Sequence, residues 1–306
     1  MNGGRGPAAG SRPFFVVAVA PCRPIAGVEA SMALISSSGN PRIKAIRALR
    51  SRDERERTGL FFAEGLRIVT EALQLKAGVA TLVVAPQLLR GGAARRMVAE
   101  QADAGAPLLE VTAEVFESLS ARDGPAGLGA VVRQHWESLF EISPAEGRCW
   151  IALEGVQDPG NLGTILRSSD AAGGAGVILL GAATDPYHPT AVRASMGAIF
   201  SQRLIRADLN QIAAWSRRNR CTVIGASGAA ARDYRAVVYR PPVVLLMGSE
   251  QHGLSPESLD LCHATARIPM LGRSDSLNLA VATSLLLYEA LRQCPPPEWR
   301  HSGPGA

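Results

Sequence analysis

Residues 243–254 read Val-Val-Leu-Leu-Met-Gly-Ser-Glu-Gln-His-Gly-Leu and decide the fold class of this chain. The first five are all apolar, with no alternation of polar and apolar side chains. A continuous apolar run is typical of a strand buried on both faces, as in a parallel sheet covered by helices. Residues 177–180 have the same character. The two runs together predict an α/β domain built on a parallel sheet.

The loop that follows the first of these runs is a candidate ligand site. Ligands of open α/β sheets bind beyond the carboxyl ends of the strands. Gly248 and Gly253 would allow the backbone to approach a ligand closely. His252 is a weak candidate for a general base, because an exposed loop histidine is the commoner case. An ordinary strand-to-helix turn remains the alternative interpretation.

A second segment, residues 153–167, reads Leu-Glu-Gly-Val-Gln-Asp-Pro-Gly-Asn-Leu-Gly-Thr-Ile-Leu-Arg. A strand ends, a Pro-Gly turn follows, and Asn161 stands where we expect a helix N-cap. Gly163 and Arg167 are four residues apart and share one helix face. Glycine costs about 1 kcal/mol in a helix interior, so we expect open space beside Arg167. The alternative is a turn followed by a surface ion pair.

A third segment, residues 268–282, contains a strand end, Pro269, a polar loop and the start of a helix. The helix is apolar nearly all round, which predicts that it is buried. We expect Ser276 to be its N-cap. Asn278, polar at the start of a buried helix, needs a hydrogen-bond partner.

The chain divides by composition into five parts. Residues 1–34 are expected to be a disordered leader, and either Met1 or Met32 could be the true start. Residues 35–133 alternate helices and strands as a smaller α/β domain, residues 134–147 are the expected linker, residues 148–294 form the parallel-sheet domain and residues 295–306 are a disordered tail. Strands are expected at 60–63, 80–85, 108–111, 129–132, 150–153, 176–180, 203–205, 222–226, 243–247 and 266–268. Helices are expected at 41–49, 66–75, 91–102, 112–119, 162–172, 189–199, 209–219, 256–261 and 277–293.

Bulk composition narrows the class of protein. The 306 residues carry a formal net charge of +5, which favours an anionic partner without proving one. The five cysteines include no CxxC pair, so we expect neither a disulfide framework nor a metal site, and we expect a reducing cytoplasm. No stretch reaches the ~18 apolar residues that cross a membrane. The apolar run at 14–21 is too short and too interrupted by proline for us to favour a signal peptide.

Positive charge is concentrated between residues 42 and 57. Seven basic residues face three acidic ones there, a local excess of four positive charges. We interpret the segment as a face that contacts phosphate groups. The alternative is a solvated helix face with i,i+4 ion pairs. The seven basic residues are Arg42, Lys44, Arg47, Arg50, Arg52, Arg55 and Arg57.

Several common catalytic motifs are missing from the chain. The sequence contains no strand–GxGxxG–helix unit, no GxxxxGK[ST] loop, no HExxH and no GxSxG. Their absence disfavours an ordinary dinucleotide enzyme, a P-loop enzyme and the common hydrolases.

In their order and spacing, the three segments resemble the SpoU (TrmH) family of S-adenosylmethionine-dependent RNA methyltransferases. The matching pieces are Asn161-Leu-Gly-Thr-Ile-Leu-Arg167, Gly248-Ser-Glu-Gln-His-Gly-Leu254, and Ile268-Pro-Met270 with Ser276-Leu-Asn278. Upstream, Ser38-Gly-Asn-Pro-Arg-Ile-Lys44 and Phe61-Phe-Ala-Glu-Gly-Leu-Arg67 resemble the substrate-binding domain that precedes the catalytic domain in many members. The resemblance covers about residues 35–292.

The resemblance implies a fold, a cofactor and an assembly. The catalytic domain would contain a trefoil knot of the SPOUT type, S-adenosylmethionine would lie in the knot, and the protein would be a homodimer with its sites near the interface. The implied catalytic residues are Asn161, Arg167, Glu250, Ser276 and Asn278. The implied cofactor-binding residues are Leu246, Met247, Gly248, Ile268, Met270 and Leu277. The RNA-binding candidates are Arg42, Lys44, Arg47, Arg50 and Arg67.

The implied reaction moves a methyl group to a ribose 2′-hydroxyl, which only RNA has. Because arginine does not lose its proton in proteins, we expect Arg167 to grip a phosphate rather than act as a base. Ribosomal RNA rather than transfer RNA is the expected substrate, and 23S rRNA is the expected molecule. The alternatives are a tRNA 2′-O-methyltransferase, an RNA-binding protein without catalysis, and a Rossmann-like enzyme acting on a small molecule.

Overall fold

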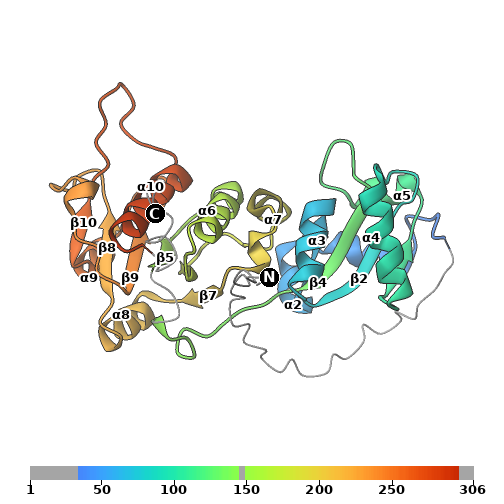
Figure 1. Cartoon of the computed structure of the whole chain (residues 1–306), viewed down its shortest axis with the longest axis horizontal. Coiled ribbons are helices and arrows are strands. Elements are labelled where there is room, and N and C mark those ends of the chain that lie inside the picture. Colours follow the sequence, from blue (N-terminus) through green and yellow to red (C-terminus); the bar gives the residue numbers. More distant parts are fainter. Residues whose placement is uncertain (1–33, 145–148, 296–306) are drawn as a thin grey trace, which may run out of the picture.

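The computed structural model describes residues 34–144 and 149–295, so the expected leader, tail and start codon lie almost wholly outside the described residues. Two α/β domains lie side by side along the long axis of the molecule (Figure 1). Each domain is built on its own sheet. The α/β class expected from the sequence is confirmed.

The N-terminal domain has a four-stranded mixed sheet in the order β1-β4-β2-β3. β4 pairs antiparallel with β1 and with β2, whereas β2 and β3 are parallel. The strands are β1 (Leu60–Glu64), β2 (Val79–Val84), β3 (Leu108–Glu110) and β4 (Leu128–Arg133). The helices are α1 (Pro41–Ala48), α2 (Arg52–Thr58), α3 (Leu66–Gln74), α4 (Gly92–Asp103) and α5 (Ala113–Leu119).

Local capping explains where these helices begin. The Asn40 side chain accepts a hydrogen bond from the Arg42 amide at 2.9 Å at the start of α1. The Thr112 hydroxyl accepts from the Val115 amide at 3.4 Å at the start of α5, as expected. All eight elements expected in this domain are present, and no end is shifted by more than one residue. The sequence interpretation missed α2.

The C-terminal domain has a six-stranded sheet in the order β10-β8-β9-β5-β6-β7, and every strand pair is parallel. All five residues of β6 and of β9 are buried, as the continuous apolar runs predicted. The strands are β5 (Cys149–Glu154), β6 (Gly176–Leu180), β7 (Leu204–Ala207), β8 (Thr222–Ala226), β9 (Val243–Met247) and β10 (Ala264–Ala266). The helices are α6 (Pro159–Ala171), α7 (Pro189–Ser195), α8 (Leu209–Arg218), α9 (Pro256–Leu261) and α10 (Leu279–Gln293).

Helices cover both faces of this sheet. The side chains of α6 and α10 belong to one apolar cluster, with Ile151 and Leu245 from the strands. Those of α8 and α9 belong to a cluster on the opposite face, with Trp150 and Leu246. Leu139, from the segment expected to be a linker, is 3% exposed in that second cluster, so part of this segment packs against the sheet.

Some expected elements differ from the structure: the helix expected at 162–172, for example, begins at Pro159. The helix expected at 189–199 ends at Ser195, because Met196 and Gly197 take left-handed φ angles of 53° and 102°. A Cβ atom at Gly197 would lie 2.6 Å from Glu71 Cγ of α3, so the turn occurs where the two domains approach. The strand expected at 266–268 lies instead at Ala264–Ala266.

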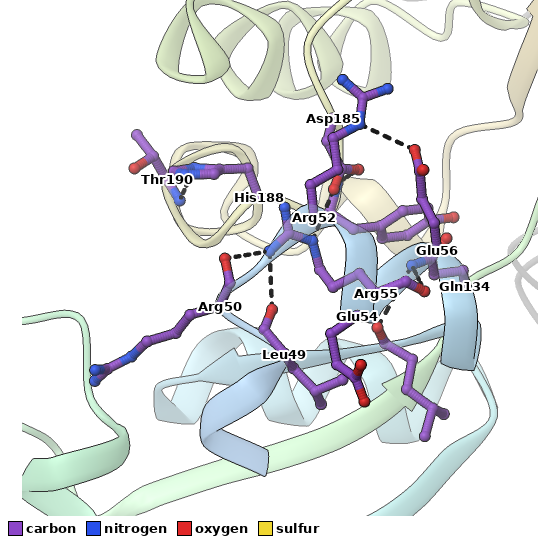
Figure 2. A network of polar contacts seen from close by, with 12 residues as sticks. Leu49, Arg50, Arg52, Glu54, Arg55, Glu56, Gln134, Asp185, His188 and Thr190 are labelled. Atoms are coloured by element: carbon purple, nitrogen blue, oxygen red, sulfur yellow. Dashed lines mark hydrogen bonds and ion pairs between the residues drawn. The ribbon is translucent and has the colours of Figure 1, made fainter. Parts of the chain in front are cut away.

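A buried ion pair joins the two domains (Figure 2). Arg55 of α2 donates through Nε to Asp185 Oδ2 at 2.7 Å, and the side chains are 1% and 5% exposed. Arg55 Nη1 also donates to the carbonyl oxygens of Leu49 and Arg50, each at 2.8 Å. The second carboxylate oxygen of Asp185 accepts from the Tyr187 amide at 2.9 Å. Both charges are therefore hydrogen-bonded, as buried charges require.

Aromatic side chains extend this interface. The Tyr187 hydroxyl accepts from the His135 amide at 2.8 Å and donates to the His135 carbonyl at 2.6 Å. Phe61 of β1 lies 4.7 Å from the Tyr187 ring, between ring centroids. Trp136 meets Tyr187 edge-on, and the Arg206 guanidinium lies 3.9 Å from the Trp136 ring centroid. The domain interface thus combines apolar, polar and charged contacts.

Within residues 34–144 and 149–295, no helix combines the length and apolarity needed to cross a membrane. The same ranges contain no group of three or more His, Cys, Asp or Glu side chains that could hold a metal ion.

Candidate active site

Three residues from the three sequence segments form one hydrogen-bonded chain. Asn278 Nδ2 donates to Asn161 Oδ1 at 2.8 Å, and Asn161 Nδ2 donates to Glu250 Oε1 at 2.9 Å. These contacts join residues 117 and 89 positions apart in the sequence. The network lies at the first turns of α6 and α10 and in the loop after β9, beyond the carboxyl ends of the strands. This is where a parallel α/β sheet binds its ligands.

Glu250 is held in its ionised form by this network. Its carboxylate also accepts from the backbone amides of Gln157 and Asp158, at 3.2 and 3.4 Å. Partial burial alone would raise the pKa of Glu250, but the bonds from Asn161 and from these amides outweigh burial and place the pKa below its ordinary value. The Glu250 carboxylate thereby fixes the orientation of the Asn161 amide.

The helix caps differ from those expected. Asp158 is the N-cap of α6 and accepts from the Asn161 amide at 2.7 Å, because Pro159 already occupies the first helical turn. The N-cap role expected for Asn161 is therefore wrong. The Asp-Pro dipeptide was the signal in the sequence that could have located this cap.

The cap expected at Ser276 is also wrong. Asn278 caps α10, because its Oδ1 accepts from the Ala280 and Val281 amides at 2.9 and 3.3 Å. Its Nδ2 remains available for Asn161, so one amide side chain both caps the helix and supports the network. The Ser276 hydroxyl donates to Asp275 Oδ1 at 3.1 Å and lies in the exposed loop, outside the network.

Arg167 projects from α6 into solvent. The side chain is exposed, and no ion pair or hydrogen bond to it is found in the described parts of the chain. The two acids nearest in sequence have other partners: Glu154 accepts from the Ser255 amide at 3.0 Å, and Asp170 accepts from the Ser201 hydroxyl at 2.7 Å. The surface ion pair of the alternative interpretation is therefore not found within residues 34–144 and 149–295.

The open space expected beside Gly163 is not present. Gly163 is buried, and a Cβ atom there would clash with the Ala191 carbonyl oxygen and lie 2.7 Å from Ala194 Cβ. Glycine is needed because it lets α7 pack directly on α6. The cost of glycine in the helix is thus offset by close helix packing rather than by a ligand.

The expected cofactor-binding residues fall into two groups. Leu246, Met247 and Gly248 are buried at the end of β9. A Cβ atom at Gly248 would overlap the backbone of Gly253, and the Ser249–Gly253 pair closes this turn with hydrogen bonds of 3.1 and 3.0 Å. Gly248 therefore accommodates its own loop; the close approach to a ligand that we expected is not what requires this glycine.

The second group lies in the loop between β10 and α10, which projects from the domain (Figure 1). Ile268 packs partly against the core, whereas Met270 and Leu277 are 36% and 39% exposed. Among the described residues, no backbone group of residues 268–277 has a hydrogen-bond partner. Unpaired backbone donors and acceptors beside exposed apolar side chains fit a ligand with a nucleoside and an aliphatic arm, as S-adenosylmethionine has.

Of the RNA-binding candidates, two are held by a neighbouring helix end. Arg47 Nη2 donates to the Ser118 hydroxyl at 2.7 Å, and Arg50 Nη2 donates to the carbonyl oxygens of Ser118 and Ser120 at 3.0 and 2.6 Å. Lys44 and Arg67 are exposed, and Arg42 is partly buried.

The rest of the basic segment does not form a phosphate face. Arg55 is buried in its ion pair with Asp185. Arg52 pairs with Glu56 at 2.9 Å, and Arg57 pairs with Glu54 at 2.6 Å, both within α2. For this helix the alternative interpretation, a solvated face with intrahelical pairs, is the correct one.

Known proteins resemble both domains of this chain. The model of the SpoU rRNA methylase family matches residues 148–288, and the model of the MRM3-like substrate-binding domain matches residues 40–130. A 23S rRNA (uridine(2479)-2′-O)-methyltransferase of Streptomyces viridochromogenes is 33% identical over 84% of this chain and 91% of its own length. An S-adenosylmethionine-bound rRNA methyltransferase of Sinorhizobium meliloti is 41% identical, with a TM-score of 0.78 over 86% of this chain and 99% of its own.

The fold, the site and the similarity to known proteins together define an RNA methyltransferase whose catalytic domain follows a substrate-binding domain. More particularly, the chain belongs to the SpoU rRNA methylase family. The family implies a SPOUT-type trefoil knot in the C-terminal domain.

Proposed function

We propose that this enzyme transfers a methyl group from S-adenosylmethionine to a ribose 2′-hydroxyl of 23S ribosomal RNA. The observation that carries the proposal is the Asn278–Asn161–Glu250 network, with the exposed Arg167 on the same helix as Asn161 and the unpaired 268–277 loop directly before Asn278. Relatives support the substrate: the Streptomyces protein and a Bacillus subtilis 23S rRNA (guanosine(2553)-2′-O)-methyltransferase carry the reaction in their names. The latter is 26% identical over 84% of this chain and 98% of its own length.

The chain's own residues supply alignment. S-adenosylmethionine contributes a methyl group already activated on a sulfonium, so the protein must align oxygen, carbon and sulfur, which is worth several kcal/mol. Arg167 grips the phosphate beside the target nucleotide through two parallel N–H bonds and so orients the hydroxyl. Glu250 and Asn278 hold both ends of the Asn161 amide, so Asn161 presents a fixed polar surface to the ribose.

The remaining proposed residues complete the catalytic set, hold the cofactor or hold the RNA. Ser276 completes the catalytic set from the exposed loop, and the cofactor is held by the end of β9 and by the loop before α10. Substrate RNA is held by the first domain, where the guanidiniums of Arg47 and Arg50 keep further N–H groups free for phosphate. The proposed residues are Leu246, Met247, Gly248, Ile268, Met270 and Leu277 for the cofactor, and Arg42, Lys44, Arg47, Arg50 and Arg67 for RNA.

The enzyme acts as a homodimer in this proposal. Val281, Leu285 and Tyr288 recur at i, i+4 and i+7 on α10 and are 48%, 37% and 47% exposed, an apolar stripe that a second copy would cover. The Ser284 hydroxyl donates to the Ser168 hydroxyl at 2.8 Å, so this helix lies against α6, which bears the catalytic residues.

Light scattering on purified protein tests the dimer. Val281→Glu should yield monomers, whereas Phe140→Glu, at an apolar position that is 60% exposed and next to Leu139 on the opposite face of the sheet, should remain dimeric. A wild-type monomer, or a dimer that tolerates glutamate at position 281, would contradict the dimer proposal.

Mapping 2′-O-methyl groups in RNA tests the reaction and its substrate. Cells lacking the gene should lose one methylation in 23S rRNA, and the wild-type gene but not Arg167→Ala should restore it. Loss of a tRNA methylation instead would overturn the substrate class. Unchanged methylation of all RNA would overturn the reaction.

A further inference from the structure

A cleft lies where α7 meets the N-terminal domain. α7 is placed between α6 and the first domain (Figure 1). The cleft is lined by Arg50 and Arg122 from the first domain and by Arg193 from α7, over an apolar floor that includes Phe62 and Val192. Both domains therefore contribute cations to one surface feature.

The charge of the cleft is positive. Three arginines and one glutamate line it, which leaves an excess of two positive charges. The glutamate, Glu64, already accepts from the Ser120 hydroxyl at 2.8 and 3.0 Å. The Arg122 and Arg193 side chains are exposed, and neither has an ion pair among the residues that the structure describes. Two unpaired cations that face one cleft attract an anion.

The lining of the cleft selects the kind of anion. Exposed guanidiniums from both domains lie beside an apolar floor, and the volume between them is small, about 30 Å³. A ligand must therefore offer an anionic group to the guanidiniums and a less polar group to the floor. A phosphodiester with an attached ribose meets this condition: the phosphate pairs with the guanidiniums, and the apolar floor lies beneath the sugar.

The position of α7 connects the cleft with the catalytic helix. Ala191 and Ala194 face Gly163 of α6, whereas Val192 and Arg193 face the cleft. Packed helices lie about 8–10 Å apart, so α7 separates Arg193 from the catalytic helix by the width of one helix. The buried Arg55–Asp185 pair holds the two domains together, and with them the arginines on the two sides of the cleft.

We propose that this cleft is a phosphate subsite for the substrate RNA, bound jointly by Arg122 and Arg193. The RNA backbone then passes from the first domain across α7 to Arg167. This inference rests on the proposed function, in that the ligand is RNA, and it adds two contacts outside the residues already assigned to RNA. Because phosphate contacts position a nucleic acid without reading its sequence, the subsite sets the register of the strand at the methyl-transfer site.

The salt dependence of binding tests the subsite. The probe is an unmodified 23S rRNA transcript, titrated at several salt concentrations with Arg122→Gln, Arg193→Gln and the double variant. Each lost phosphate contact should make the negative slope of log K against log salt concentration shallower by about 0.7–0.9. Binding at about 0.1 M salt should then weaken roughly five- to eightfold. Arg96→Gln, an exposed arginine of α4 away from the cleft, is the matched control and should leave the slope unchanged.

The outcomes separate this inference from the function on which it rests. Equal slopes for wild type and both single variants, in a wild-type enzyme that methylates the transcript, overturn the subsite and leave the function intact. A shallower slope for only one of the two single variants overturns joint binding by both arginines. A wild type that neither binds nor methylates RNA overturns both proposals. Cofactor affinity by calorimetry and the melting temperature should not change in either single variant.

Discussion

Replacing Arg55 with methionine is expected to destabilise the protein strongly, because the change leaves a buried carboxylate without its cation. Asp185 is 5% exposed, and Arg55 Nε lies 2.7 Å from its Oδ2. Methionine fills a similar volume but carries neither charge nor N–H groups. The carbonyl oxygens of Leu49 and Arg50 lose their 2.8 Å donor as well.

The expected loss in the free energy of unfolding follows from these contacts. Removing one partner of a buried pair costs about 3–5 kcal/mol, and each carbonyl left without its bond adds ~1 kcal/mol. A typical domain is stable by only about 5–15 kcal/mol, so the variant should lose a large fraction of its stability. Asp185→Asn should cost less than Arg55→Met, because Arg55 keeps its bonds to the carbonyl oxygens of Leu49 and Arg50 and an amide oxygen can still accept from Arg55 Nε.

Urea unfolding, followed by tryptophan fluorescence and circular dichroism, measures the effect. The double variant Arg55→Met with Asp185→Asn should lose clearly less than the sum of the single losses, since it buries no unpaired charge. Arg57→Met on the same helix is the control, because its pair with Glu54 is solvated and its side chain is 70% exposed. An Arg55→Met midpoint equal to that of wild type, or strictly additive losses in the double variant, would refute the reasoning.

Substitutions at three further positions test the site and the helix packing beside it. Arg167→Lys and Arg167→Ala should each slow single-turnover methyl transfer roughly a hundredfold, since a lost contact to charge costs about 3 kcal/mol, at an unchanged melting temperature; a near-normal lysine variant would remove Arg167 from the catalytic set. Gly163→Ala should lower stability by about 1–3 kcal/mol by overpacking against Ala191, and an unchanged melting temperature would contradict this. Because the folded-state pKa of Glu250 lies below its ordinary 4.5, its contribution to stability is present above that value and is lost as pH falls through the folded pKa. Glu250→Gln should therefore reduce the fall in the urea midpoint below about pH 4.5 and leave the slope above about pH 6 unchanged; an equally steep acid fall would contradict the assignment.

The strands were predictable because their signal is local. β6 and β9 begin and end where expected, since each is a continuous apolar run between breaks in the pattern. α2 was not predictable in this way, because Arg-Asp-Glu-Arg-Glu-Arg-Thr contains no apolar residue to show a helical period. Its one buried side chain is Arg55, whose partner is 130 positions away in the sequence.

For the site, residue types were easier to predict than geometry. The motifs identified Asn161, Glu250 and Asn278 before their contacts were known. The family matches and the relatives confirm the expected class, which is an S-adenosylmethionine-dependent RNA 2′-O-methyltransferase with a substrate-binding domain. The bonds among these residues depend on the packing of two helix ends and a loop. The same holds for Gly163, whose neighbour is a helix rather than the expected open space.

The loop at residues 268–277 bears on how tightly any ligand can bind. Its backbone amides have no partner in the described protein, so they should exchange with solvent hydrogen far faster than those of the sheet. A ligand that engages them must restrict a segment whose ordering costs about 1–2 kcal/mol per residue. The measured binding free energy is then the favourable contact energy reduced by the free-energy cost of this ordering. Gly272 has open space around its Cα and no left-handed φ, so Gly272→Ala should tighten binding by preorganisation alone, without adding one contact to the ligand.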